Sequence, residues 1–481
     1  MRKGKRFLGN TMWNFKDFSE NTAVISEEGI QLTYQELQEH TQKLVQMIGE
    51  RCLIFSLCKN TVGSLIGYTG CLNGNIVPLM LDSNLEKGLL HNLLETYYPK
   101  YIWLPEEMKE EFPDLEECYR DMGYVLLKTS FIVNYPVFDE LALLLTTSGS
   151  TGSPKLVRQS YCNIKENAKS IVEYLELDAT ERPITTLPMN YTYGLSIINS
   201  HLMVGATMLL TEKGLMQKEF WQFFKEQLAT SFGGVPYTFE MLDKLRFFRM
   251  ELPSLRTMTQ AGGKLSPELH RKFAEHSMET GRHFVVMYGQ TEATARMSYL
   301  PWEKSLEKYG SMGIAIPGGK FSLIDVNGDL IEKSYVVGEL VYEGANVTLG
   351  YAECGEDLIK GDERFGKLVT GDMAKRDEDG FYYIVGRKKR FLKIFGNRVN
   401  LDEIDRMVKT KFNLMDFASA GVDDKMHLFI TEETHKDAIR TFIAEKTGLN
   451  LSAFHIVVID EIPKNEAGKT LYKELEKYYK S

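Results

Sequence analysis

The 481-residue sequence lacks the features of an exported or membrane-embedded protein. Its first 15 residues, MRKGKRFLGNTMWNF, are basic but have no apolar run of the length that a signal peptide needs. The longest uncharged stretch, residues 61–81, contains four glycines and a proline. We therefore expect a buried helix followed by a strand in that stretch, and no membrane span.

Cysteine is scarce, and an excess of positive charge is absent. The six cysteines are scattered without a CxxC pair or metal-ligand spacing, which predicts reduced thiols and a cytoplasmic protein. Lys and Arg total 57 against 66 Asp and Glu, a net charge of −9. This balance argues against broad binding to nucleic acid, although a small anionic ligand would still need local positive charge.

The pattern of apolar residues predicts an α/β protein with more than one folding unit. Hydrophobic residues make up 43% of the chain, and strand-like runs such as NTAVI and CLIFSL alternate with helical patterns over the first 230 residues. The first helix is predicted to start at Thr33, with Glu36 completing a capping box. A length of 481 residues suggests about three folding units.

The pattern of apolar residues and turn signals changes in the last third of the chain. Asn327-Gly328 and Asp379-Gly380 interrupt pairs of short apolar runs, so antiparallel strands are expected from about 310 to 386. The segment after Arg387 is charged and mixed and ends in the amphipathic run LYKELEKYYK. A small C-terminal domain that ends in a helix is therefore predicted.

The most specific segment is LLLTTSGSTGSPK, residues 143–155, where an apolar strand runs into a loop of glycines and hydroxyls closed by a lysine. Its glycines allow backbone N–H groups to approach a polyphosphate, the hydroxyls add donors, and the lysine adds charge. It is not a Walker loop, because neither Gly149 nor Gly152 is followed at the required distance by Gly-Lys. A flexible Gly/Ser turn is the alternative. The loop residues predicted to bind ATP are Thr147, Ser148, Gly149, Ser150, Thr151, Gly152 and Lys155.

This loop closely resembles the phosphate loop of the adenylate-forming superfamily, which comprises acyl-CoA synthetases, peptide-synthetase adenylation domains and luciferases. Four further motifs follow in the order of that family: QAGGK at 260–264, YGQTE at 288–292, TGD at 370–372 with GR at 386–387, and PKNEAGK at 463–469. The resemblance implies a large N-terminal domain of stacked α/β sheets with a small antiparallel barrel-like subdomain, residues 1–388. It implies a small mobile α+β C-terminal domain at 389–481.

The resemblance also implies the chemistry, in which ATP and Mg²⁺ convert a small carboxylic acid into an acyl-adenylate. Glu292 would hold the magnesium, Thr291 would hydrogen-bond the α-phosphate, and Lys469 would stabilise the charge that develops during transfer. Catalytic roles thus fall on Lys469, Thr291 and Glu292. The implied contacts to adenine and ribose are Gly262, Gly263, Tyr288, Gly289, Asp372 and Arg387.

Residues 387–390 form the basic run RKKR, which also occurs in nuclear-localisation and nucleic-acid-binding patches. In the resembling family, however, the residue two after the ribose arginine is the hinge about which the C-terminal domain rotates. Here that residue is Lys389. Gly396 would face the acyl pocket in the second conformation and leave room for a slender thiol arm.

The acid pocket is expected around Tyr193, Gly194, Val235 and Ala261. Residues 188–197 hold no acidic side chain, whereas relatives that activate α-amino acids commonly place an Asp there. A plain acid is therefore favoured over an α-amino acid. The Tyr193-Gly194 step resembles that of acyl- and aryl-CoA ligases, although the edge of an ordinary core strand would look similar.

The acceptor of the acyl group stays open. A thiol is the leading prediction, either of CoA or of a phosphopantetheinyl carrier protein. The chain before the phosphate loop is shorter than in many CoA ligases, and Leu156 follows Lys155 where relatives often have glycine. An amine acceptor and a nucleotide-binding pseudoenzyme without turnover are the alternatives. Retention of Glu292 and Lys469 argues against the pseudoenzyme.

Overall fold

A computed structural model gives the fold of residues 12–132, 135–146, 155–395, 397–414, 416–464 and 470–479. The chain forms two compact units, Met1–Lys320 with Glu343–Leu368, and Phe321–Tyr342 with Val369–Ser481. These two units divide the chain differently from the predicted domains, because residues 321–342 and 369–388 belong to the second unit. The domain boundary at residue 388 stays a prediction. Within the described residues, none of the helices has the length and apolarity to cross a bilayer.

The first unit contains an eight-stranded mixed sheet. Its strands pair in parallel at β3–β4, β3–β5 and β4–β8, and antiparallel at β5–β7, β6–β7, β8–β9 and β9–β19. In spatial order the strands are β19 (Gly350–Ala352), β9 (Leu156–Ser160), β8 (Leu141–Thr146), β4 (Val77–Asp82), β3 (Leu53–Cys58), β5 (Tyr101–Pro105), β7 (Tyr124–Lys128) and β6 (Glu116–Asp121).

The second sheet of this unit has nine strands. The central six are parallel neighbours, and β2, β15 and β16 join antiparallel at the edges. The order is β16 (Ile314–Ala315), β15 (Ser298–Tyr299), β14 (His283–Tyr288), β13 (Thr257–Gln260), β12 (Ser231–Gly234), β10 (Pro183–Ile184), β11 (Met208–Leu210), β1 (Thr22–Ser26) and β2 (Gln31–Thr33).

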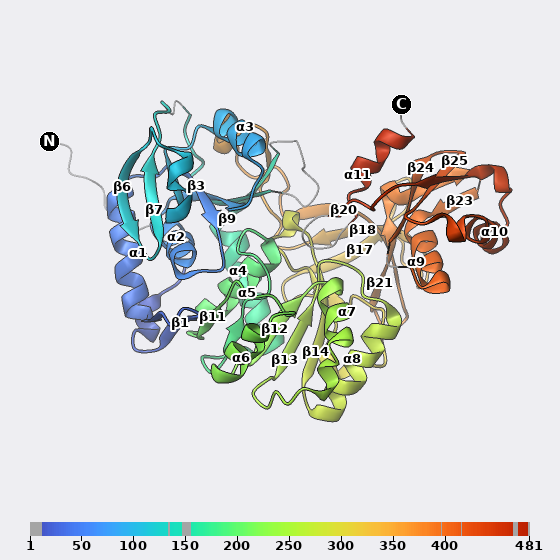
Figure 1. Ribbon diagram of the computed structural model, residues 1–481, viewed down its shortest axis with the longest axis horizontal. Helices are drawn as coiled ribbons and strands as arrows, with labels where there is room; N and C mark the ends of the chain where they lie inside the picture. Colours follow the sequence, from blue (N-terminus) through green and yellow to red (C-terminus); the bar gives the residue numbers. More distant parts are fainter. Residues whose placement is uncertain are drawn as a thin grey trace. The chain divides into compact units, whose positions relative to one another are not determined.

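Among the described residues of this unit, eight helices accompany these sheets (Figure 1). One apolar core contains side chains from both sheets and from the helices. Helices α2 and α5 are buried along almost their whole length, and α4 lies against α5. Such all-round burial fits helices enclosed between two sheets. The helices are α1 (Tyr34–Ile48), α2 (Val62–Asn73), α3 (Lys87–Tyr97), α4 (Tyr161–Leu175), α5 (Thr192–Met203), α6 (Lys218–Glu226), α7 (Pro236–Lys244) and α8 (Pro267–Thr280).

The second unit begins with a four-stranded sheet and continues into a small α+β fold. The first sheet has the order β17 (Lys320–Ile324), β18 (Gly338–Glu343), β20 (Lys367–Arg376) and β21 (Tyr382–Arg387). A two-stranded and a three-stranded sheet follow, with their own apolar core. Their elements are β22 (Phe391–Ile394), β23 (Asn397–Asn400), α9 (Leu401–Phe412), β24 (Phe417–Val422), β25 (Lys425–Ile430), α10 (Lys436–Thr447), β26 (Phe454–Val458) and α11 (Tyr472–Leu475).

These elements confirm the predicted α/β class with several sheets, and most of the local predictions. Thr33 and Glu36 form the predicted capping box. Residues 61–81 form the buried helix α2 and strand β4, and all six cysteines are free thiols. Gly328 and Gly380 adopt φ of +90° and +87° in the two predicted hairpin turns. The C-terminal helix is shorter than predicted: α11 has four residues and a 3-10 turn follows it.

We expect a buried histidine, His270 on α8, to contribute to the acid sensitivity of the first unit. The backbone N–H of Gly310 donates to its Nδ1 over 3.0 Å, so Nε2 carries the proton and donates to Ser305 Oγ over 3.1 Å. Burial lowers the pKa of His270 from 6.5 to about 4. The unfolded chain binds the extra proton first as the pH falls, so the stability held above pH 6.5 is lost between about 6.5 and 4.

We expect His270→Gln to reduce this acid sensitivity. The shift corresponds to about 3 kcal/mol in total, of which about 2 kcal/mol is lost by pH 5. Glutamine can accept at one terminal atom and donate at the other, so it retains the two hydrogen bonds without the proton uptake. Melting temperatures at pH 7.5 and pH 5 should show a smaller drop for the variant than for the wild type. His91→Gln, on an exposed face of α3, is the control that should not change the drop.

Candidate nucleotide and acid site

The YGQTE segment starts at the carboxyl end of β14 and turns sharply after Tyr288. A Cβ atom on Gly289 would lie 1.5 Å from the carbonyl oxygen of Ala295, so only glycine fits there. Thr294 and Ala295 themselves adopt left-handed φ angles of 52° and 89°. Strained residues of this kind persist only where their surroundings hold them in place.

Asn346 holds this turn. Its side-chain amide donates to the carbonyl oxygens of Ala293 over 2.7 Å and Arg296 over 3.0 Å, and its own carbonyl accepts from the Thr294 hydroxyl over 2.7 Å. The contacts reach about 50 residues along the chain. The backbone that carries Thr291 and Glu292 is therefore fixed from a distant segment.

The carboxylate of Glu292 is hydrogen-bonded to Tyr351, and two cationic side chains lie near the ring of that tyrosine. Tyr351 donates its hydroxyl to Glu292 Oε1 over 2.8 Å. Lys155 Nζ lies 3.8 Å from the centre of the Tyr351 ring, and the guanidinium of Arg364 lies 4.6 Å from it. Arg364 also donates to the Glu292 carbonyl oxygen over 3.0 Å. The first unit thus places one carboxylate and two positive charges around one aromatic ring.

Tyr351 is suited to stay a hydrogen-bond donor to Glu292. Burial, followed by the nearby Glu292 carboxylate, raises the pKa of Tyr351 from 10.0 to about 12. Its hydroxyl therefore keeps its proton at neutral pH. Sequence analysis missed both Tyr351 and Arg364, because they lie 59 and 72 residues beyond Glu292 and belong to no recognised motif.

The donor set around Glu292 fits Mg²⁺ better than a structural metal. Among the described residues there is no group of three or more His, Cys, Asp or Glu side chains that could hold an ion. Magnesium is commonly bound by one or two carboxylates together with substrate phosphates and water. The single carboxylate of Glu292 would match that arrangement once the phosphates of a nucleotide supplied the other oxygens.

Three of the four residues predicted for the acid pocket meet in one apolar cluster. Tyr193, Val235 and Ala261 are buried together with Leu187 and Met287. The Tyr193 hydroxyl donates to Thr259 Oγ1 on β13 over 2.8 Å, which fixes the ring.

The fourth predicted residue, Gly194, follows directly in α5. A Cβ there would lie 2.3 Å from the Pro188 carbonyl oxygen, so glycine lets the helix approach the preceding loop. Gly262 adjoins the same cluster: it has φ +82°, and a Cβ on it would lie 2.7 Å from the Tyr191 hydroxyl and 3.0 Å from Val235 Cγ1. Gly263 follows beside Pro236. The predicted adenine segment and acid pocket are thus neighbours.

A cavity of about 280 Å³ opens beside this cluster and shares Tyr174, Val285, Tyr299 and Trp302 with it. None of the four predicted acid-pocket residues lines it, and three glutamates do: Glu173, Glu176 and Glu303. Carboxylates on the lining disfavour an anionic substrate. This lining does not favour the cavity as the acid site, and an acid pocket at Tyr193, Val235 and Ala261 stays a prediction.

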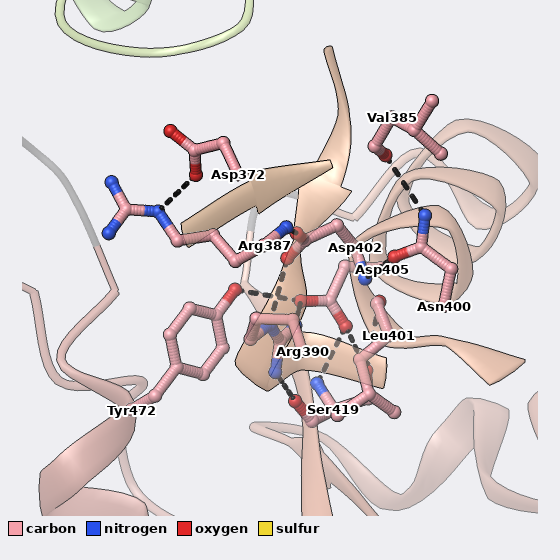
Figure 2. Close-up of polar contacts among 10 residues, drawn as sticks. All are labelled: Asp372, Val385, Arg387, Arg390, Asn400, Leu401, Asp402, Asp405, Ser419 and Tyr472. Atoms are coloured by element: carbon pink, nitrogen blue, oxygen red, sulfur yellow. Dashed lines mark hydrogen bonds and ion pairs between the residues drawn. The ribbon is translucent and has the colours of Figure 1, made fainter. Parts of the chain in front are cut away.

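In the second unit, the two residues predicted for ribose binding form an ion pair (Figure 2). Asp372 and Arg387 face each other across β20 and β21, with 3.0 Å between Asp372 Oδ1 and Arg387 Nε. The Asp372 side chain is 4% exposed and that of Arg387 is 64% exposed. A buried acceptor with an exposed donor beside it suits the recognition of sugar hydroxyls.

The predicted hinge, Lys389, lies in the 3-10 turn Lys388–Arg390. The side chain of its neighbour Arg390 anchors this turn (Figure 2). Arg390 forms ion pairs of 2.8 Å with both Asp402 and Asp405, and its guanidinium lies 3.8 Å from the ring centre of Tyr472. The Tyr472 hydroxyl donates to Asp405 Oδ2 over 2.8 Å. The turn and the start of α11 are thereby tied to the same buried carboxylate.

Several predicted site residues lie outside the described residues: Thr147, Ser148, Gly149, Ser150, Thr151, Gly152, Gly396 and Lys469. The chain on either side of residues 465–469 is described. Lys464 and Thr470 form an antiparallel bridge, and the Leu471 N–H donates to the Pro463 carbonyl oxygen over 2.8 Å. The two flanks of the lysine loop are therefore held together.

Comparison with known proteins gives the family. The profile of the AMP-binding enzymes matches residues 12–352, which is well over half of the chain. The chain belongs to the AMP-binding enzymes. Two curated relatives of this AMP-binding enzyme are an oxalate–CoA ligase of Arabidopsis thaliana and a 2-succinylbenzoate–CoA ligase of Bacillus licheniformis. They are 29% and 28% identical over 74% and 70% of the chain, and each alignment spans 70% of the relative. These matches confirm the predicted superfamily and enzyme class, an AMP-forming acid–thiol ligase.

Solved structures show the same fold. O-succinylbenzoate CoA synthetase of Bacillus subtilis, in complex with ATP and magnesium, superposes with a TM-score of 0.74 at 20% identity, covering 95% of this AMP-binding enzyme and 97% of that chain. ATP-bound MatB of Rhodopseudomonas palustris gives a TM-score of 0.77 at 20% identity over 97% of both chains. The predicted fold class is confirmed, with a large N-terminal and a smaller C-terminal domain.

Proposed function

We propose that the enzyme activates a carboxylic acid with ATP and Mg²⁺ and then transfers the acyl group to the thiol of CoA. In the first step a carboxylate oxygen attacks the α-phosphorus, the bond to the bridging oxygen breaks, and pyrophosphate leaves. In the second step the thiolate attacks the acyl carbonyl and AMP leaves. Two anions meet in the first step, so the site must neutralise phosphate charge and align the reactants.

The observation that carries this proposal is the group around Glu292. Lys155 and Arg364 lie on the ring of Tyr351, and Tyr351 holds the Glu292 carboxylate. Lys155 directly follows the TTSGSTGSP segment, which we propose wraps the phosphates. Bound magnesium would neutralise phosphate charge, with Glu292 as its protein ligand. Thr291 and Tyr288, on the same turn, are proposed to contact the α-phosphate and adenine.

The remaining roles follow from the chemistry of each group. Asp372 and Arg387 are proposed to bind the ribose, since a carboxylate accepts from hydroxyls and a guanidinium donates to oxygens. Lys469 is proposed as the catalytic cation, Lys389 as the hinge, and Gly396 as part of the acceptor channel. CoA as the acceptor is supported by the CoA ligases among the curated relatives. A phosphopantetheinyl carrier protein stays a prediction from sequence.

Acid-dependent exchange of radiolabelled pyrophosphate into ATP tests the first step. We expect exchange with at least one member of a panel of short, branched, aromatic and dicarboxylic acids, and none without acid. Adding CoA should then give an acyl thioester and AMP in equal amounts by mass spectrometry. Release of ADP, or ATP binding without exchange for any acid, would contradict the proposal.

A further inference from the structure

Arg296 is a buried arginine that the proposed chemistry does not use. It follows the YGQTE turn and is 2% exposed. Its Nε donates to Ser196 Oγ over 3.0 Å, and its Nη1 lies 3.1 Å from the Tyr174 hydroxyl and 3.2 Å from Met287 Sδ. A guanidinium has five N–H donors. These contacts take three of them, which leaves the two on Nη2 without a partner among the described residues.

Arg296 also has no carboxylate partner among the described residues. The two other buried arginines both have carboxylate partners, Arg158 with Glu363 and Arg390 with Asp402 and Asp405. Arg296 forms no ion pair with any described residue, and the undescribed segments of its unit, 1–11, 133–134 and 147–154, contain no Asp or Glu. A buried charge without a counter-ion carries a large free-energy cost. A ligand that brings a negative charge would remove that cost.

Arg296 lies against the proposed acid pocket. Its guanidinium is 5.2 Å from the centre of the Tyr193 ring, and its Nη1 contact Met287 belongs to the same cluster as Val235 and Ala261. An acid that binds with its reactive carboxylate at the phosphates and its body along Tyr193 would therefore have its far end near this guanidinium.

A small cavity of about 10 Å³ also adjoins Arg296. Its lining is mostly apolar and includes Leu175 and Ile197, with His201 and Thr259 as polar members, and it has about the volume that one water molecule needs. His201 donates from Nδ1 to the Ile197 carbonyl oxygen over 2.8 Å, so its buried Nε2 is an acceptor, and it has no partner among the described residues. Polar groups thus remain unsatisfied on this side of the pocket.

We propose that Arg296 is a specificity residue that binds a second carboxylate on the acid substrate, so that the enzyme prefers dicarboxylic acids. The inference rests on the proposed acid activation and adds the class of acid. One carboxylate reacts with ATP, and the other accepts from the free donors of Arg296. Charge-assisted bonds of this kind inside a protein are strong and geometrically specific.

Matched acids that differ only at the far end test this role. Pyrophosphate exchange is measured with succinate, glutarate, adipate and phthalate, and with the monomethyl ester of each. We expect the wild type to favour the diacids in kcat/KM by about 100-fold, the scale of a lost partner in a buried charged pair. Arg296→Met should remove this preference by raising the KM for the diacids, with the KM for ATP unchanged.

Two further variants separate specificity from structure. Ser196→Ala removes the partner of Nε but keeps the charge, and it should retain the preference for diacids. Arg296→Lys keeps a charge but loses the fork geometry, so its KM for diacids should rise about 10-fold while half-esters change little. If circular dichroism shows that Arg296→Met does not fold, these two variants test the role of Arg296 in its place. An equal loss with diacids and half-esters would assign Arg296 a structural role only and overturn the proposal.

The outcomes also distinguish this inference from the proposed function. Exchange with half-esters or monocarboxylic acids but not with diacids overturns the role of Arg296 and leaves adenylation intact. Absence of exchange with every acid contradicts adenylation itself. Calorimetric titration of the four diacids into the wild type in the presence of ATP then tests Arg296 alone. Binding that Arg296→Lys weakens supports the role, and no binding overturns it.

Discussion

Replacing Lys469 with alanine is expected to lower acid-dependent pyrophosphate exchange by about 100-fold or more while the Kd for ATP stays nearly the same. An ammonium between the substrate carboxylate and the bridging phosphate oxygen stabilises charge that develops only during transfer. Its loss therefore appears in the rate of adenylation and hardly in ground-state binding. Exchange kinetics and calorimetric titration of ATP measure the two quantities separately.

Lys464→Ala is the matched control for this prediction. Lys464 is at the base of the same loop, bridges to Thr470, and pairs with Asp416 through its side chain. The Lys464→Ala substitution removes the same charge from the same loop, but the Lys464 side chain already has a partner, Asp416, within the second unit. We expect exchange close to that of the wild type. Equal losses in both variants, or an unchanged rate in Lys469→Ala, would contradict the catalytic role.

The sequence predicted those parts of the site in which local geometry dictates the residue. Gly289 and Gly194 are required because a backbone oxygen occupies the space of a Cβ, and such constraints recur as short motifs. The pairing of Asp372 with Arg387 follows from a hairpin whose turn, Asp379-Gly380, is visible in the sequence. Tyr193, Val235 and Ala261 were expected together from the family resemblance, and the structure places them in one cluster.

The contacts that sequence reasoning missed are long-range and carry no local pattern. Tyr351 lies on β19, which joins the sheet beside β9, and only this pairing brings its hydroxyl to Glu292. Arg296 looks in the sequence like any charged residue after a turn. Its burial depends on α4, α5 and β14 packing around it, which hydrophobic periodicity does not encode. That no carboxylate among the described residues pairs with Arg296 is evident only once the core is assembled.

Replacing Glu292 with glutamine is expected to lower acid-dependent exchange by about 100- to 1,000-fold and to raise the Mg²⁺ concentration needed for half-maximal rate. The amide is nearly the same size, and its carbonyl oxygen can still accept from the Tyr351 hydroxyl, so the turn should keep its structure. Only the negative charge that would hold the metal is lost. A series of Mg²⁺ concentrations at fixed ATP measures the change.

Two companion variants show whether the charge or its positioning matters at Glu292. Tyr351→Phe removes the hydrogen bond to Oε1 but leaves the carboxylate, and a lost bond to a charged group predicts a smaller decrease, about 10-fold. Glu279→Gln removes a carboxylate from the exposed end of α8 and should leave both rate and Mg²⁺ dependence unchanged. If Glu292→Gln retained the Mg²⁺ dependence of the wild type, Glu292 would not be the metal ligand. Lys155 and Arg364 remain in place in every one of these variants. In that case these two cations would neutralise the phosphates, and the magnesium would be bound by the nucleotide alone.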